Sequence, residues 1–140
     1  MGRDQTDRLS RLLVEFFERF SSWEHAVVRG SGLTLPQMHT LEILGDGGDM
    51  RMKELAGRMG VTTGTLTVLV DRLEKRGLVR RKPNDQDRRS VLVELTDAGQ
   101  RHFERHHALH RRLTQELGAG LPEPDQAKLA ELLEAMLARF

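Results

Sequence analysis

The chain has 140 residues, with 22 lysines and arginines against 21 aspartates and glutamates, so its formal net charge is +1. This length suits one domain with a hydrophobic core. The chain has no cysteine, which excludes disulfides, thiolate nucleophiles and cysteine-ligated metal sites. No apolar run approaches the roughly 18 residues that a membrane-spanning helix needs. The first residues lead into a charged segment without a signal-peptide pattern, so we expect a cytoplasmic protein.

Charge is unevenly distributed along the chain. Residues 51–94 contain eleven basic and six acidic residues, a local net charge of +5, and the remaining residues therefore carry −4. A basic middle segment between acidic ends is the asymmetry expected of a module that contacts phosphates and is attached to a separate scaffold.

Apolar residues at the N-terminal end repeat at helical spacing over about five turns. They predict a long helix with a broad apolar face, which serves either for core packing or for dimerisation. We favour dimerisation, because the C-terminal end has the same property. The residues are Leu9, Leu12, Leu13, Phe16, Phe17, Phe20, Trp23 and Val27.

A second helix is predicted after the break at residues 30–32. Thr34 and Gln37 form a capping box, and Pro36 is tolerated in the first turn. We expect this helix to end at a glycine-rich loop, residues 45–49. The loop lacks the Lys-Ser/Thr ending of a phosphate-binding loop and follows no strand, so we interpret it as a connector.

Residues 54–69 have the spacing of a helix-turn-helix. Ala56 is small enough for a second helix to cross closely, and Gly60 permits the tight turn. Thr62 is a good N-cap for the second helix, which we expect to end at Gly77. Apolar contacts between the two crossing helices are expected from Leu55, Met59, Val61, Leu66 and Leu69.

A β-hairpin is predicted directly after this motif, with strands at residues 79–82 and 90–95 and a polar turn at 83–88. Val91, Val93 and Leu95 should alternate toward the core. A hairpin in this position is a wing.

Two more helices are predicted at the C-terminal end. Thr96 caps a fifth helix, and Phe103, His106, His110, Leu113 and Leu117 share one of its faces. The last helix carries an apolar stripe up to Phe140. We expect the two ends of the chain to interlock with those of a second copy.

In the order and spacing of its motifs the chain resembles the MarR family of transcriptional regulators, nearly end to end. The motifs are residues 33–37, 53–56, 65–79, 85–91 and 95–99. The resemblance implies a mainly α fold with a small β-hairpin, in which residues 33–96 form a winged helix-turn-helix lobe and residues 1–32 and 97–140 dimerise. One departure is Met52, which stands where the family often has a helix-capping serine or threonine.

The resemblance also implies how the protein would bind DNA. Each recognition helix would enter a major groove of a pseudo-palindromic operator, and each wing would lie along a minor groove. Free N–H groups and small hydroxyls in the first turn of the recognition helix suit phosphates and base edges. Val68 can pack on a thymine methyl, and Arg72 can reach a phosphate or a base. The alternative is that the threonines only cap the helix and cover its surface. The candidate residues are Thr62, Thr63, Gly64, Thr65, Thr67, Val68 and Arg72.

Arg88 and Arg89 lie on the turn of the wing, where an arginine can enter a narrow minor groove. In the family pattern Arg89 matches the minor-groove arginine, and Asp87 stands where a carboxylate would hold its side chain in place. Asp85 and Asp87 do not form a calcium loop, because no further carboxylates follow at the required spacing.

Two kinds of effector are compatible with the sequence. The family commonly binds a small aromatic ligand between the dimer helices and the DNA-binding lobe, and Phe20, Trp23, Met38 and His39 are candidates to line such a crevice. Alternatively His39, His106 and His110 bind zinc, since His106 and His110 are one helical turn apart. Glu24 or His25 could approach the same face. Half-buried interface histidines are the simpler explanation of this pair.

We therefore expect a homodimeric, sequence-specific DNA-binding regulator, a ligand-responsive repressor, and no enzyme. One alternative is a histidine-liganded zinc sensor of the same fold. Another is a winged-helix protein-interaction module, which the arginines at 88 and 89 argue against. A histidine-metal hydrolase lacks a carboxylate-supported histidine triad with a general base.

Overall fold

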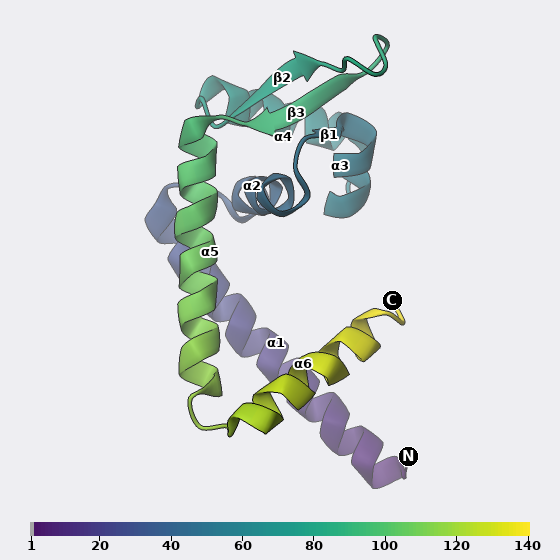
Figure 1. The fold of residues 1–140 in the computed structure, drawn as a ribbon, viewed down its shortest axis with the longest axis vertical. Coiled ribbons are helices and arrows are strands. Elements are labelled where there is room, and N and C mark those ends of the chain that lie inside the picture. The colour runs from purple at the N-terminus through teal and green to yellow at the C-terminus, as the bar shows by residue number, and fades with distance from the viewer. Residues whose placement is uncertain (1) are drawn as a thin grey trace. The chain divides into compact units, whose positions relative to one another are not determined.

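The computed structural model describes residues 2–140, which form six helices and three short strands (Figure 1). They divide into two compact units, the first ending at Phe103 and the second comprising Glu104–Phe140, which are described separately below. The elements in chain order are α1 (Arg3–Ser31), α2 (Leu35–Gly47), β1 (Met50–Arg51), α3 (Met52–Met59), α4 (Thr63–Lys75), β2 (Val79–Pro83), β3 (Val91–Leu95), α5 (Asp97–Gly118) and α6 (Glu123–Leu137).

The core of the first unit is built where the sequence predicts helix crossing. Leu55 of α3 and Leu66 of α4 are completely buried, and Met59, Val61 and Leu69 pack against the same cluster while partly buried. Gly60 adopts a left-handed backbone conformation (φ 67°) between the two helices, which glycine adopts without steric cost. The predicted helix-turn-helix is confirmed.

The predicted capping signals also occur in the structure. The Thr34 hydroxyl accepts a hydrogen bond from the Gln37 backbone N–H, and the Gln37 side chain accepts one from the Thr34 N–H. The hydroxyls of Thr62 and Thr96 cap α4 and α5 in the same way, each by accepting from an N–H three residues later at 3.1 Å.

The wing strands belong to a three-stranded antiparallel sheet with the order β1-β3-β2. Val79 pairs with Leu95 and Arg81 with Val93, while Met50 of β1 pairs with Val93 from the other side. Sequence patterning did not predict β1, because two residues are too few to show alternation. Val93 is fully buried as expected, but Val91 is 43% exposed. The expectation for Val91 was wrong, since it pairs with Pro83 at the outer end of the hairpin.

Helix α2 is longer than the sequence predicts, because Gly45–Gly47 is helical and is not a loop. A Cβ atom at Gly45 would lie 2.3 Å from the Phe103 ring. This glycine therefore allows the ring to pack closely against α2 and does not interrupt the helix. The helix ends at Gly48, whose φ is 77°.

Helix α1 contributes Val28 to the core of the first unit, while its N-terminal two thirds leave their apolar residues exposed. Phe17, for example, is 68% exposed. In the second unit, Gln126 joins the end of α5 to α6, since its side-chain amide donates to the carbonyls of Gly118 (3.1 Å) and Leu121 (2.9 Å). Helix α6 buries none of its residues.

Within residues 2–140 the structure contains no helix whose length and apolar character would allow it to span a membrane.

Candidate nucleic-acid interface

Helix α4 separates its buried residues from its candidate DNA-contacting residues. Leu66, Val70 and Leu73 lie on the inner face and are completely buried. The candidate residues on the other face are all exposed, as the 3.6-residue helical period requires. They are Thr62, Thr63, Gly64, Thr65, Thr67, Val68 and Arg72.

The hydroxyls at the start of α4 have different partners. The Thr62 hydroxyl caps the helix and also donates to the Thr65 hydroxyl at 3.1 Å. The Thr67 hydroxyl donates to the Thr63 carbonyl at 2.8 Å, which leaves its lone pairs available to accept. Thr62 therefore already has a structural role as the N-cap, whereas Thr67 retains accepting capacity on the exposed face.

Two residues on the outer face of α4 have no role in packing. Val68 is 51% exposed although it is apolar. A Cβ atom at Gly64 would meet only the Thr62 hydroxyl, at 3.9 Å, and the backbone there has no positive φ. Because a glycine inside a helix is about 0.5–1 kcal/mol less favourable than alanine, the fold does not explain Gly64.

The wing loop, residues 84–90, is organised by a buried asparagine that the sequence analysis missed. The Asn84 side chain donates to the Ser90 hydroxyl (2.9 Å) and accepts from the Gln86 N–H (3.1 Å). Asparagine commonly bonds to the backbone two residues later in turns, so the Pro83-Asn84 start of the loop carried a usable signal.

Asp87 interacts with the backbone of Arg89. One carboxylate oxygen accepts from the Arg89 N–H at 3.0 Å, and the other lies 3.6 Å from the guanidinium of Arg51. Asp87 thus contacts the main chain of Arg89 in this structure, while the hold on the Arg89 side chain stays a prediction. Arg88 and Arg89 are exposed.

A second arginine of the wing, Arg81 on β2, joins the wing to the recognition helix. Its guanidinium lies 2.7 Å from the Asp71 carboxylate and 3.4 Å from the Glu74 carboxylate, and its N–H donates to Glu74 at 3.1 Å. Sequence reasoning did not find this link, because Arg81 lies seven positions from Glu74 and ten from Asp71.

Glu94 on β3 lies between two cations of β2. It forms ion pairs with Arg80 and with Lys82, and Lys82 also pairs with Asp49. Hydrogen bonds from Lys82 and Arg80 lower the pKa of the Glu94 carboxyl below its ordinary value of 4.5. The hydrogen bonds that Lys82 donates to Asp49 and Glu94 raise the pKa of Lys82, and the bond that Arg80 donates to Glu94 raises the pKa of Arg80.

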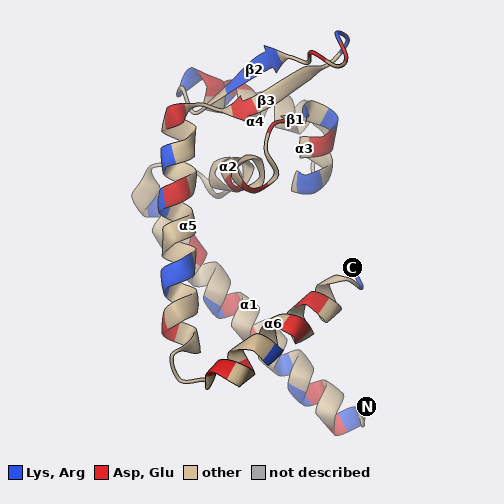
Figure 2. Ribbon diagram, in the orientation of Figure 1, with Lys and Arg blue, Asp and Glu red and all other residues tan. Residues whose placement is uncertain are grey.

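Five of the eleven basic residues in the 51–94 segment form ion pairs, namely Arg51, Arg58, Arg80, Arg81 and Lys82. The others have no ion pair within residues 2–140, and most of them lie on α4 and its C-terminal end or at the tip of the wing, where basic residues are visible in Figure 2. Exposed cations that form no ion pair can bind phosphates. They are Lys53, Arg72, Lys75, Arg76, Arg88 and Arg89.

The four candidate effector residues lie in different environments. Met38 belongs to the hydrophobic core, where it is only 2% exposed. Its neighbour His39 lies on the exposed side of α2. Phe20 and Trp23 remain together on α1, with ring centroids 5.8 Å apart.

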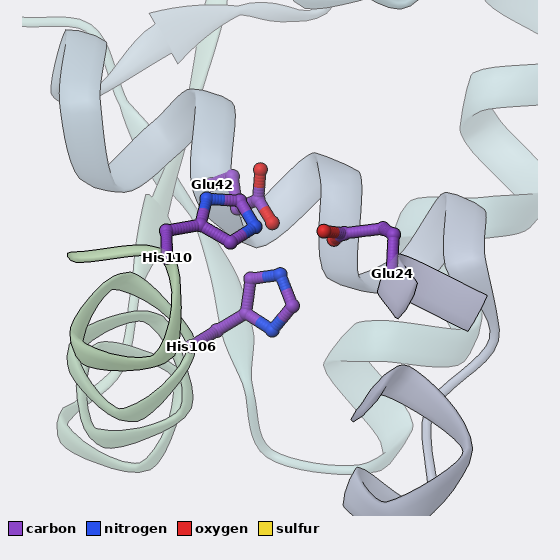
Figure 3. A group of neighbouring side chains, drawn as sticks. All are labelled: Glu24, Glu42, His106 and His110. Atoms are coloured by element: carbon purple, nitrogen blue, oxygen red, sulfur yellow. The ribbon is translucent and has the colours of Figure 1, made fainter. Parts of the chain in front are cut away.

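The candidate metal ligands form one pair in each unit (Figure 3). In the first unit, carboxylate oxygens of Glu24 on α1 and Glu42 on α2 lie within 4.8 Å of each other. In the second unit, the rings of His106 and His110 are packed edge to face with centroids 4.5 Å apart. His39 is in neither pair, whereas Glu42 was not among the residues that the sequence suggested.

The MarR family profile matches residues 33–91. The HTH-type transcriptional regulator YcgE of Bacillus subtilis is 31% identical over 105 residues, which cover 72% of this chain and 68% of that protein. The chain belongs to the MarR family. It is also similar to the HTH-type transcriptional repressor NicR of Pseudomonas putida, with 34% identity over 69% of this chain and 61% of that repressor.

Among solved structures, Streptococcus pneumoniae FabT in complex with DNA superposes with a TM-score of 0.83 at 25% identity, covering 95% of each chain. The predicted winged helix-turn-helix fold is therefore confirmed. Because MarR proteins are transcription regulators, family membership also confirms the expectation that the protein is not an enzyme.

Proposed function

We propose that this protein is a homodimeric repressor that binds a pseudo-palindromic operator through α4 and the wing loop. The observation that carries the proposal is the outer face of α4. It combines an unexplained glycine, an exposed valine and an arginine without an ion pair in residues 2–140. None of these features stabilises the fold, and each suits a surface that contacts nucleic acid.

Helix α4 would enter the major groove. Gly64 lets the backbone approach the DNA closely, and Thr63 and Thr67 offer hydroxyls to base edges and phosphates. Val68 would contact a thymine methyl, which only the major groove displays. Arg72 lies one turn beyond Val68 on the same face and would bind a phosphate or a guanine.

The wing loop would place Arg89 in the minor groove, with Arg88 beside it. Both guanidiniums are exposed, while the loop backbone is fixed by Asn84 and Asp87. Because the turn is already ordered, little additional backbone entropy is lost when its side chains bind. A narrow minor groove supplies the negative potential that attracts it.

The dimer is proposed from the exposed apolar faces of the terminal helices. In the first unit, Leu9, Leu13 and Phe17 are exposed on α1, and in the second unit Leu132, Leu133 and Leu137 are exposed on α6. Each such side chain gains about 1.5–3 kcal/mol when it is fully buried. A second copy of the chain would bury both faces and would place two recognition helices on one operator.

Repression and ligand response complete the proposal. The similarity to proteins named as repressors supports repression. Phe20 and Trp23 offer stacking surfaces that suit an aromatic effector. Release from the operator would follow if the effector bound the DNA-free conformation more tightly.

Glycine-to-alanine substitution tests the role of α4. Gly64→Ala should raise the free energy of unfolding by about 0.4–1 kcal/mol, because the site has space and an ordinary helical backbone. It should also weaken binding to a duplex that the wild-type protein selects from a random pool. Gly30→Ala on α1 is the matched control, since a Cβ there also meets nothing within 4 Å. Unchanged affinity of the Gly64 variant would contradict close approach of α4.

A second candidate function is zinc-responsive regulation by the same fold. Zinc is bound in proteins by histidine nitrogens, cysteine sulfurs and carboxylate oxygens. The observation that favours this candidate is the imidazole pair of the second unit, His106 and His110, whose ring centroids lie 4.5 Å apart on one helix. Imidazole nitrogens suit zinc better than calcium or magnesium, which prefer oxygen ligands.

Calorimetric titration with zinc chloride tests this candidate. His106→Gln and His110→Gln should each weaken zinc binding at least tenfold, because each removes one ligand and loss of even an outer-shell partner costs about that much. His39→Gln should have no effect, because His39 is exposed and belongs to neither pair. If the wild-type protein takes up no zinc, or if only the His39 variant loses it, the second candidate is wrong.

A further inference from the structure

Arg51 joins α3, the first helix of the helix-turn-helix, to the wing. It was not among the residues that the sequence suggested for DNA binding. It is the second residue of β1 and occupies the N-cap position of α3, where its side chain makes no capping hydrogen bond. Instead its guanidinium lies 3.6 Å from the Asp87 carboxylate in the wing loop. Since Arg51 also pairs with Leu92 in the β1–β3 ladder, its backbone is fixed to the sheet.

The wing loop has little apolar packing to hold it. A hollow of about 390 Å³ lies between it and the β1–α3 segment, and Asp49, Glu54, Lys82 and Asp85 are among the residues that line it. Two ion pairs join the β1–α3 segment and the residue before it to the wing. Lys82 of β2 pairs with Asp49, and Arg51 of β1 pairs with Asp87 in the wing loop.

Asp87 links Arg51 to the backbone of Arg89. The carboxylate oxygen that does not face Arg51 accepts the backbone N–H of Arg89. The main chain of Asp87 is itself fixed, because its N–H donates to Asn84 and its carbonyl accepts from Ser90. A displacement of the Asp87 side chain therefore moves the Arg89 backbone.

We infer that Arg51 is a positioning residue that sets the direction in which Arg89 leaves the wing, by holding the Asp87 carboxylate. This inference rests on the proposed contact between Arg89 and the minor groove. It assigns Arg51 an action through Asp87 and no contact of its own with DNA.

A double-mutant cycle between Arg51→Ala and Asp87→Asn tests the inference. The asparagine retains an oxygen that accepts the Arg89 N–H but loses the charge that attracts Arg51. Affinity and its salt dependence are measured on a duplex selected by the wild-type protein. Arg58→Ala is the matched control, because Arg58 is an exposed arginine of α3 that pairs with Glu54 and not with the wing. Arg89→Ala measures the wing contact itself.

Arg51→Ala, Asp87→Asn and the double variant should each weaken binding by the same factor, about two- to fivefold, as expected for loss of one exposed ion pair. The salt slope should not change, Arg51→Lys should restore most of the affinity, and Arg58→Ala should bind like wild type.

Three results would overturn the inference. If the effects of the single variants multiply and Arg51→Ala reduces the salt slope by about 0.9, Arg51 contacts a phosphate directly. If Arg58→Ala weakens binding as much as Arg51→Ala, the effect is one of general charge. If Arg89→Ala weakens binding but Arg51→Ala does not, the positioning role is wrong while the wing contact stands. An Arg89→Ala variant that binds like wild type would instead contradict the wing contact of the proposed function, and the inference with it.

Discussion

Helices α4 and α6 carry similar apolar stripes, yet only α4 buries its stripe. Leu66, Val70 and Leu73 of α4 are completely buried within the first unit, whereas Leu132 of α6 is 52% exposed and the whole helix buries no residue. A helical apolar pattern thus shows which face of a helix can be buried, but it does not show which part of the chain, or which second copy, covers that face. For α4 the partner is the core of the same unit, and for α6 we propose a second copy of the chain.

The largest effect is expected from a change in the buried stripe of α4. Leu66→Ala should lower the free energy of unfolding by about 2–5 kcal/mol, because it removes buried methyl groups and leaves a cavity. Val68→Ala, two residues along the same helix but on its exposed face, should change it by less than about 0.5 kcal/mol. Urea denaturation measures both. Equal losses would mean that the outer face of α4 is also part of a core.

The next effect concerns the exposed stripe of α6. Leu133→Glu should convert the dimer to a monomer at low micromolar concentration, because a carboxylate cannot be buried there without a large desolvation cost. Sedimentation measures the mass. Glu134→Gln, at the adjacent position of the same helix, serves as the control and should remain dimeric. If the wild-type protein sediments as a folded monomer, the proposal that a second copy covers the apolar stripe of α6 is wrong.

The smallest effect is expected at Glu94, which joins the wing strands by charge and not by packing. Its pKa is lowered in the folded protein by Lys82 and Arg80. Its contribution is therefore fully present above the ordinary value of 4.5 and is lost as the pH falls through the folded value. The difference in Tm between wild type and Glu94→Gln should be constant near neutral pH and should shrink below about pH 4.5. A difference that persists at lower pH would contradict this electrostatic role.

The sequence was sufficient for the features that depend on local chemistry. The capping box at Thr34, the N-cap at Thr62 and the turn at Gly60 each place their residues next to one another in the chain, and all three were predicted correctly. The helical period likewise separated the buried face of α4 from its exposed candidate residues. Family resemblance added the wing arginines.

The sequence was insufficient where long-range contacts decide the structure. Gly45 looked like the start of a loop, but the Phe103 ring, far along the chain, explains the glycine within the helix. The pairing of Arg81 with Asp71 and that of Arg51 with Asp87 also join distant residues. Met38 shares the apolar character of a ligand-contacting residue, and only packing shows that it belongs to the core.

The most direct test of the account is the salt dependence of operator binding. The wild-type protein is used to select duplexes from a random pool, and the Kd for the selected duplex is measured between about 50 and 200 mM salt. A homodimer that binds through α4 and the wing should select a pseudo-palindromic consensus, and its affinity should fall steeply with salt, with a log–log slope near −0.9 for each phosphate that is neutralised. If no sequence is enriched, or if affinity is indifferent to salt, α4 and the wing do not form a DNA-binding surface.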